Sequence, residues 1–129
     1  MSGMLLCSCD KRNDIIPEVM VDIFLFTTQP AFSNLNAIGG WTYLNGGVRG
    51  IIVYRSTQLD FVAMDRNCTY DPSVSCATVH VESNNIAAAD TCCGSRFQLL
   101  AGNVLNGPAT RGLKLYNTSF DGSVLHIYN

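Results

Sequence analysis

The stretch Cys92-Cys93-Gly94-Ser95-Arg96-Phe97-Gln98 decides how this chain is read, because a cysteine-rich turn runs there directly into a predicted strand. A second cysteine-bearing segment, Asn67-Cys68-Thr69-Tyr70, leaves an earlier predicted strand. We expect the two loops to face each other across one small β-domain.

Short apolar runs rich in β-branched and aromatic residues, separated by Gly, Asn, Asp and Pro, predict strands throughout the chain. The predicted strands are residues 19–26, 48–55, 61–64, 78–81, 86–89, 97–100, 104–105, 113–117 and 123–128. Residues 29–47 contain Pro30, two Gly pairs and several Asn, and are predicted to be a long loop. No long helical period is present, so the expected fold is all-β with small antiparallel sheets.

The composition fits one globular domain. The chain has 129 residues, of which 47% are hydrophobic and 14% charged, with a net charge of -2. The eight Lys and Arg residues are scattered rather than clustered, which argues against a nucleic-acid partner. Six cysteines in so short a chain indicate either metal binding or an oxidising compartment.

From about Val48 to Asn129 the chain resembles the Rieske family of iron–sulfur domains. The most specific part is Gly-Ser-Arg-Phe at residues 94–97, followed by Gly-x-Val at 102–104 and Gly-Pro-Ala at 107–109. The resemblance implies a Rieske-like fold of small antiparallel sheets with two opposed cysteine-bearing loops, over residues 19–129.

In that family two thiolates hold one iron of a 2Fe-2S cluster and two imidazoles hold the other. The resemblance places Cys68 and Tyr70 at the first loop's cysteine and histidine positions, and Asp90 and Cys93 at those of the second. Only Cys68 matches in type, so we expect no cofactor and no metal. The alternative is an atypical 2Fe-2S cluster held by Cys68, Asp90, Cys93 and Tyr70 or Cys92. Its potential would lie below that of the family.

Many Rieske proteins also join the two loops by a disulfide. The resemblance places one partner at Cys92 and the other at Ser73, with Cys76 three residues further on. The pairing it favours is Cys76 with Cys92, and Cys68 with Cys93 in the space of the cluster. Four cysteines allow three pairings, and the sequence does not choose among them.

Residues 107–111, Gly-Pro-Ala-Thr-Arg, resemble the proline loop that covers the cluster in Rieske domains. Two interpretations remain open. The segment forms a rigid lid over the two disulfides, or a pocket survives beneath it.

Other catalytic signatures are missing. His80 and His126 alternate with apolar residues in predicted strands, which is typical of structural or solvent-facing histidines, so no hydrolase triad is expected. The glycine pairs lack the Lys-Ser/Thr of a phosphate loop. A thiol–disulfide role for the vicinal pair Cys92-Cys93 is a third hypothesis, but only Arg96 supplies nearby positive charge.

The N-terminus suggests a location. Leu6-Cys7-Ser8-Cys9 followed by a polar run is typical of the end of a bacterial lipoprotein signal, with Cys9 as the lipidated residue. The apolar part is shorter than a full signal, so the true start is expected upstream; the alternative is a terminus with two incidental cysteines. Residues 1–18 are thus interpreted as a signal remnant and tether.

Together these features predict a non-catalytic lipoprotein, anchored to the membrane through Cys9 in the periplasm or at the outer membrane. Its degenerate Rieske-like domain would have lost the cluster and would serve a structural role or bind an unidentified protein partner. Electron transfer through an atypical 2Fe-2S cluster is the alternative.

Overall fold

The computed structural model describes residues 15–129, and all but one of the regular elements in this range are β-strands. The strands are β1 (Asp22–Phe26), β2 (Trp41–Leu44), β3 (Ile51–Arg55), β4 (Phe61–Asp65), β5 (His80–Val81), β6 (Ala87–Ala89), β7 (Arg96–Gln98), β8 (Val104–Asn106), β9 (Leu115–Phe120) and β10 (Val124–Tyr128). The exception is the short 3-10 helix η1 (Pro30–Asn36). Within the described range no helix is long and apolar enough to cross a membrane. The all-β class is confirmed.

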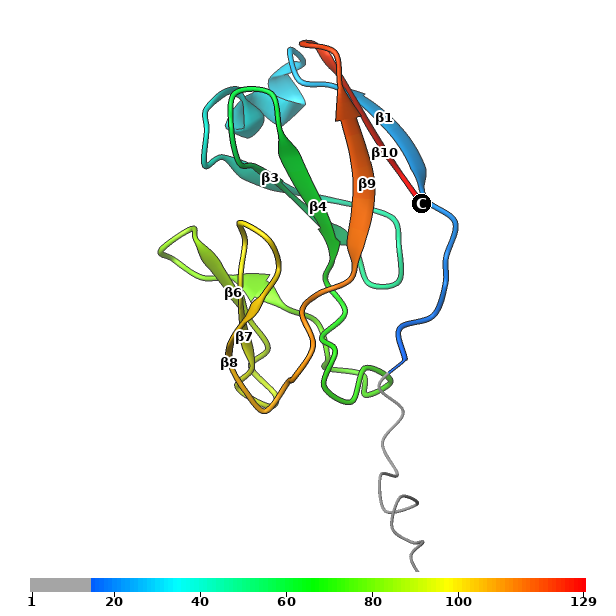
Figure 1. Ribbon diagram of the computed structural model, residues 1–129, viewed down its shortest axis with the longest axis vertical. Helices are drawn as coiled ribbons and strands as arrows, with labels where there is room; N and C mark the ends of the chain where they lie inside the picture. Colours follow the sequence, from blue (N-terminus) through cyan, green and yellow to red (C-terminus); the bar gives the residue numbers. More distant parts are fainter. Residues whose placement is uncertain (1–14) are drawn as a thin grey trace, which may run out of the picture.

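The strands form two antiparallel sheets. The larger sheet has the order β1-β10-β9-β4-β3-β2, and the smaller has the order β5-β6-β7-β8. The chain leaves the larger sheet after β4 and returns to it at β9, which pairs directly with β4. The smaller sheet is therefore an insertion between two neighbouring strands, and it lies below the larger sheet in Figure 1.

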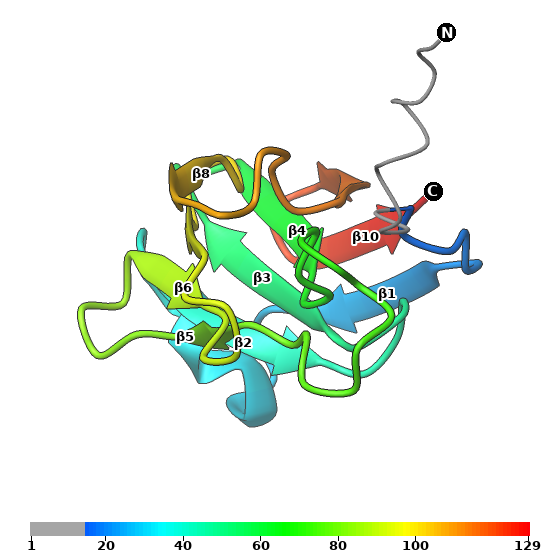
Figure 2. The ribbon, with the colours of Figure 1, turned by 90° about the horizontal axis from the view of Figure 1, so that it is seen from below.

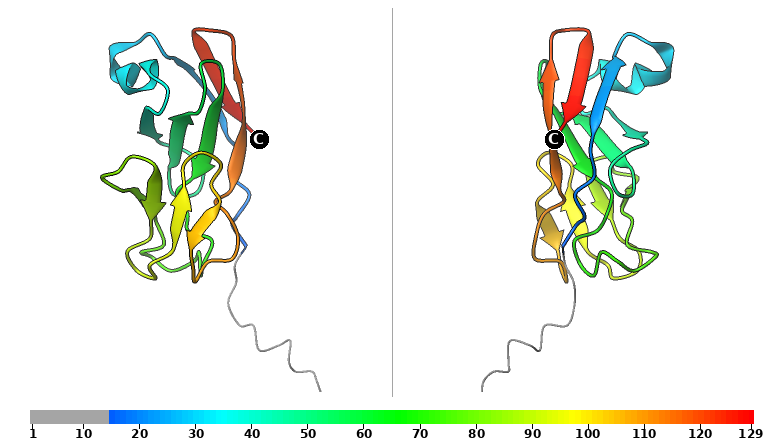
Figure 3. Two further views of the ribbon diagram at one scale, coloured as in Figure 1. Left: turned by 60° about the vertical axis from the view of Figure 1, so that its left-hand side comes forward. Right: turned by 90° about the vertical axis from the view of Figure 1, so that its right-hand side faces the viewer.

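Three loops of the insertion gather at one end of the molecule, as the view from below in Figure 2 shows. We call residues 66–79, between β4 and β5, the first cysteine loop, and residues 90–95, between β6 and β7, the second. Residues 107–114, between β8 and β9, form the proline loop. The side views of Figure 3 place η1 at the opposite end from these loops.

Each sheet has its own core, and β3 contributes to both. Ile51 and Val53 pack into the core inside the curled larger sheet, whereas Ile52 points to the other face and packs with Met64. A strand buried on both faces requires an unbroken apolar run, which explains Ile51-Ile52-Val53. The second core also contains Cys68 and Ala109, so it joins the loops to the larger sheet.

The prediction of a long loop over residues 29–47 was wrong in part. This segment contains η1 and strand β2, which pairs antiparallel with β3 so that Trp41 lies opposite Tyr54. The glycine and asparagine residues around β2 favoured a loop prediction. The strand forms because it pairs with β3, and its own β-propensity is not the cause. Every other predicted strand overlaps an observed one.

The N-terminal predictions are only partly within the described range. Cys9 and the proposed signal remnant lie outside it. Residues 15–21 contain no regular element, and Glu18 forms an ion pair with Lys114 at 3.0 Å. The boundary at residue 18 stays a prediction.

Candidate metal site between the cysteine loops

The first cysteine loop is fixed where it leaves β4. Asp65 is fully buried, and its carboxylate accepts hydrogen bonds from the backbone N–H of Asn67 at 2.9 Å and from the hydroxyl of Tyr116 at 2.7 Å. The N–H groups of Val48 and Arg49 donate to it at 2.7 and 3.2 Å. A buried carboxylate is costly unless donors surround it. These donors therefore hold the start of the loop in one place.

Gly47 and Tyr116 complete the surroundings of this carboxylate. Gly47 has φ +63°, and a Cβ atom there would lie 2.3 Å from Asp65 Oδ2, so glycine is required on both counts. Burial, and then the hydrogen bond to Asp65, raise the pKa of the Tyr116 hydroxyl above its usual range. Sequence analysis missed this contact. Its only local signal is a carboxylate at the end of the apolar run of β4.

The outer part of the same loop is held by backbone contacts and by Arg49. The N–H of Cys68 donates to Ala77 O at 2.9 Å. The guanidinium of Arg49 donates to Ser75 O at 2.9 Å and to Pro72 O at 3.0 Å. The loop is thus ordered by groups that are independent of any metal.

The second cysteine loop is a tight turn organised by Asp90. The N–H of Asp90 donates to Ser95 O at 2.9 Å, and the N–H of Gly94 donates to Asp90 O at 2.8 Å. Within the turn, Asp90 Oδ1 accepts a hydrogen bond from the N–H of Cys92 at 2.8 Å. Gly94 has φ +86°, a conformation that favours glycine. The turn thus uses Oδ1 of the buried Asp90 carboxylate and leaves Oδ2 available.

A disulfide between Cys76 and Cys92 joins the two loops, which is the pairing favoured by the resemblance. The second expected disulfide is absent, because Cys68 and Cys93 are free thiols. The sulfur of Cys93 lies within hydrogen-bond distance of Asp90 Oδ2, at 3.4 Å, and of Ser95 Oγ, at 3.2 Å.

The Cys68 thiol lies in the apolar core between the two sheets. Cys68 is fully buried. Burial, and next the neighbouring carboxylate of Asp90, raise the pKa of the Cys68 thiol far above its usual range, although the backbone N–H of Tyr70 opposes this.

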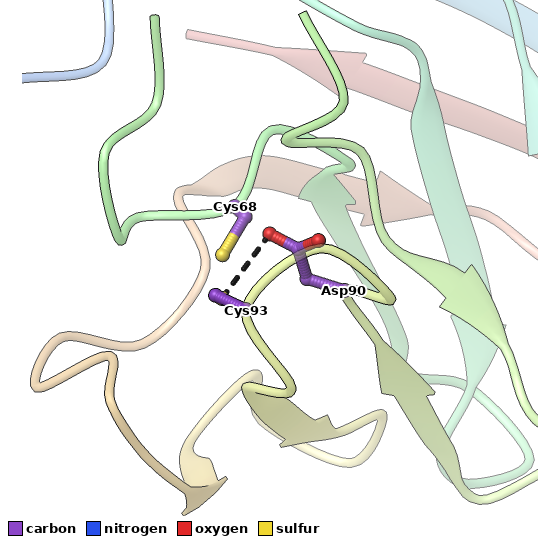
Figure 4. A group of neighbouring side chains, drawn as sticks. All are labelled: Cys68, Asp90 and Cys93. Atoms are coloured by element: carbon purple, nitrogen blue, oxygen red, sulfur yellow. Dashed lines mark hydrogen bonds between the residues drawn. The ribbon is translucent and has the colours of Figure 1, made fainter. Parts of the chain in front are cut away.

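Three possible metal ligands converge between the loops. The sulfur atoms of Cys68 and Cys93 and a carboxylate oxygen of Asp90 all lie within 4.8 Å of one another. Figure 4 shows the Cys68 sulfur and the Asp90 carboxylate directed toward Cys93. Tyr70, the fourth position given by the resemblance, lines a cavity of about 190 Å³ beside Asp90 and Cys93. The structure therefore brings three of the four predicted positions together, and Tyr70 lines only the adjoining cavity, while Cys92 is taken up by the disulfide.

The proline loop covers one side of this cluster. Ala109 is buried, and its N–H donates to Ser95 Oγ at 2.9 Å. The hydroxyl of Thr69 donates to Arg111 O at 2.5 Å, which joins the proline loop to the first cysteine loop. The adjoining cavity is lined by the two cysteine loops and by no residue of the proline loop. This arrangement fits the interpretation of the proline loop as a lid. The loop covers the free thiols of Cys68 and Cys93 instead of a second disulfide.

Both histidines lie away from the site and have other partners. His80 is exposed, and its Nδ1 lies 3.0 Å from a guanidinium nitrogen of Arg66. His126 lies 2.6 Å from Asp22 and stacks on Phe24, with ring centroids 4.0 Å apart. Neither imidazole reaches Cys68 or Cys93 to serve as a cluster ligand.

The donors present do not fit the cluster of Rieske domains. That cluster needs a pair of thiolates at one iron and a pair of imidazoles at the other. The resemblance aligns the imidazole positions with Tyr70 and Cys93, and one thiolate position with Asp90. Three of the donor atoms converge on one point instead of dividing into two pairs. The site is thus chemically different from that of the family.

The fold is nevertheless Rieske-like: two antiparallel sheets, two opposed cysteine loops joined by a disulfide, and a proline loop beside them. The chain is similar to one solved structure in particular, that of the plasma membrane Rieske protein PetC3 from the cyanobacterium Synechocystis PCC 6803. The two superpose with a TM-score of 0.60 at 24% sequence identity, over 81% of this chain and 97% of that one. This likeness concerns the fold. No protein-family model and no curated protein matches the chain.

Proposed function

We propose that this chain is a cluster-free Rieske-like module of the bacterial cell envelope, which serves a structural or binding role instead of carrying electrons. The observation that supports this most is the donor set. Tyr70 and Cys93 occupy the positions where the family has imidazoles, and Asp90 occupies that of a thiolate. With Cys68 as the single ligand that matches in type, the family's cluster lacks three of its four ligands.

The loops do not need a cluster to keep their shape. The disulfide between Cys76 and Cys92 joins them covalently, and Asp65 fixes the start of the first loop through four donors. Cys68 and Ala109 are packed in a common apolar core. In a protein that depends on metal for folding, the apo state lacks such support. The disulfide, the hydrogen bonds of Asp65 and this core thus provide the stability that a metal centre would otherwise supply.

We further propose that Cys9 carries the lipid that anchors the module to the membrane, in the periplasm or at the outer membrane. A disulfide is typical of such an oxidising compartment. The partner would be another protein of the envelope, and no reaction is assigned to the module. A scattered set of eight Lys and Arg residues gives no basis for binding nucleic acid.

One observation favours a second candidate function, electron transfer by an atypical 2Fe-2S cluster. Cys68, Asp90 and Cys93 are close together, and Tyr70 lines the adjoining cavity. Thiolate, carboxylate and phenolate all bind ferric iron. Anionic ligands in place of imidazoles would make the site more negative and lower its potential.

Anaerobic reconstitution with iron and sulfide distinguishes the two functions. The natural chain is treated beside a variant in which the family's ligands are restored by Tyr70→His, Asp90→Cys and Cys93→His, with Cys68 unchanged. After desalting, we expect the restored variant to keep iron and sulfide and the natural chain to lose both. A natural chain that keeps a stable, coloured cluster would contradict the proposed function.

A further inference from the structure

We infer that Cys68, Cys93 and Asp90 form a site for a single divalent ion of the zinc type, with a fourth coordination position open to the adjoining cavity. This goes beyond the proposed function, but it rests on one part of it, the absence of a two-iron cluster between the same loops. The ion would be held by two thiolates and one carboxylate, and water would occupy the fourth position.

The spacing of the donors fits one ion. Zinc binds sulfur at about 2.3 Å and carboxylate oxygen at about 2.0–2.2 Å in tetrahedral geometry, so its ligands lie roughly 3.5–3.8 Å apart. Cys93 Sγ and Asp90 Oδ2 are already 3.4 Å apart, and the sulfur of Cys68 lies within 4.8 Å of both. These separations are close to those between three ligands of one ion.

The surroundings orient the ligands in the way that metal sites require. Asp90 Oδ1 accepts the N–H of Cys92, which leaves Oδ2 directed toward Cys93. Hydrogen bonds of this kind fix ligand orientation and are part of a metal site's affinity. On binding, the two thiol protons leave to solvent as the thiolates coordinate the ion.

The chemistry of the donors selects the class of ion. Two thiolates favour zinc and other soft or borderline ions over magnesium or calcium, which prefer oxygen ligands. Three protein ligands with one open position are typical of zinc sites that take an exogenous ligand. The cavity of about 190 Å³ lined by Asp90 and Cys93 provides room for that ligand.

Cobalt titration tests the site directly. The full chain is used in a Cys7→Ser, Cys9→Ser background, so that the N-terminal thiols cannot contribute, with the Cys76–Cys92 disulfide kept intact. We expect one Co²⁺ per chain, a sulfur-to-cobalt charge-transfer band with tetrahedral visible bands, and displacement by one equivalent of Zn²⁺. Cys93→Ser should weaken binding more than about 100-fold and Asp90→Asn at least about 10-fold, since changes outside the ligand shell already cost about 10–100-fold.

The matched control removes both imidazoles of the chain. His80→Ala combined with His126→Ala should leave cobalt affinity unchanged, because both lie outside the site. If a ligand variant fails to fold, X-ray absorption of the zinc-loaded parent decides, with two sulfur neighbours per ion expected. Absence of binding, binding insensitive to Cys93→Ser in a folded chain, or a shell without sulfur would overturn the inference. In that case an iron-free chain leaves the proposed function intact, whereas two irons and two sulfides per chain would overturn both.

Discussion

The sulfur of Cys93 lies 3.4 Å from Asp90 Oδ2, so a thiol and a buried carboxylate meet in the second cysteine loop. The other oxygen of the same carboxylate is already used by the turn that carries Cys93. This contact places a donor pair suited to one ion beside Cys68.

Asp90 should contribute to stability mainly as an acceptor. Asp90→Ala leaves the N–H of Cys92 without its side-chain partner, and we expect a loss of about 1–3 kcal/mol in the free energy of unfolding. Asp90→Asn keeps an oxygen for this bond and should lose less than about 1 kcal/mol. Urea unfolding of the metal-free proteins measures both. Equal losses for the two variants would mean that the hydrogen bond to Cys92 contributes little.

The disulfide should be a major source of stability for the loops. Cys76 and Cys92 are separated by 16 residues in sequence, and for a loop of this size the chain-entropy model gives about 3 kcal/mol. We expect Cys76→Ala with Cys92→Ala to lose about that amount, and a mild reductant to destabilise the natural chain but not this variant. A natural chain unchanged by the reductant, once loss of the bond is verified by mass, would contradict the prediction.

The two free thiols should differ in accessibility. Cys93 is partly exposed, whereas Cys68 is fully buried, so iodoacetamide should modify Cys93 in the folded chain and Cys68 only after denaturation. Peptide mass mapping separates these sites from the remaining cysteines. Modification of both at the same rate under native conditions would show that the proline loop and its core do not shield Cys68.

Tyr116 should make the fold sensitive to alkaline pH. Its pKa is raised in the folded chain, so the unfolded chain ionises first and stability is lost as pH rises above about 10. One such group accounts for up to about 1.4 kcal/mol per pH unit. Tyr116→Phe should cost about 1–2 kcal/mol at neutral pH but lose less on going from pH 9 to 11. Parallel curves for the two proteins would exclude Tyr116 as the cause.

Much of the fold followed from local patterns, because alternating apolar runs and turn residues are local signals. The strand at Trp41–Leu44 did not, since its pairing with Ile51–Tyr54 supplies what its own sequence lacks. The contact between Asp65 and Tyr116 joins residues 51 positions apart, and no short motif encodes it.

The location of the site between the loops could be predicted from the sequence, but the oxidation state of its cysteines could not. The resemblance placed Cys68, Tyr70, Asp90 and Cys93 together between the loops; the structure brings Cys68, Asp90 and Cys93 together and has Tyr70 in the lining of the adjoining cavity. Whether the Cys68 and Cys93 thiols are bonded to each other depends on the three-dimensional arrangement of the loops, which spacing in the sequence does not reveal. The expectation of a Cys68–Cys93 disulfide was wrong, because both thiols are free.

The most direct test of the account is the iron and acid-labile sulfide content of the natural chain, purified without oxygen and with its visible spectrum recorded. The account predicts a colourless protein with neither element in stoichiometric amount. Two irons and two sulfides per chain in a coloured protein would contradict it.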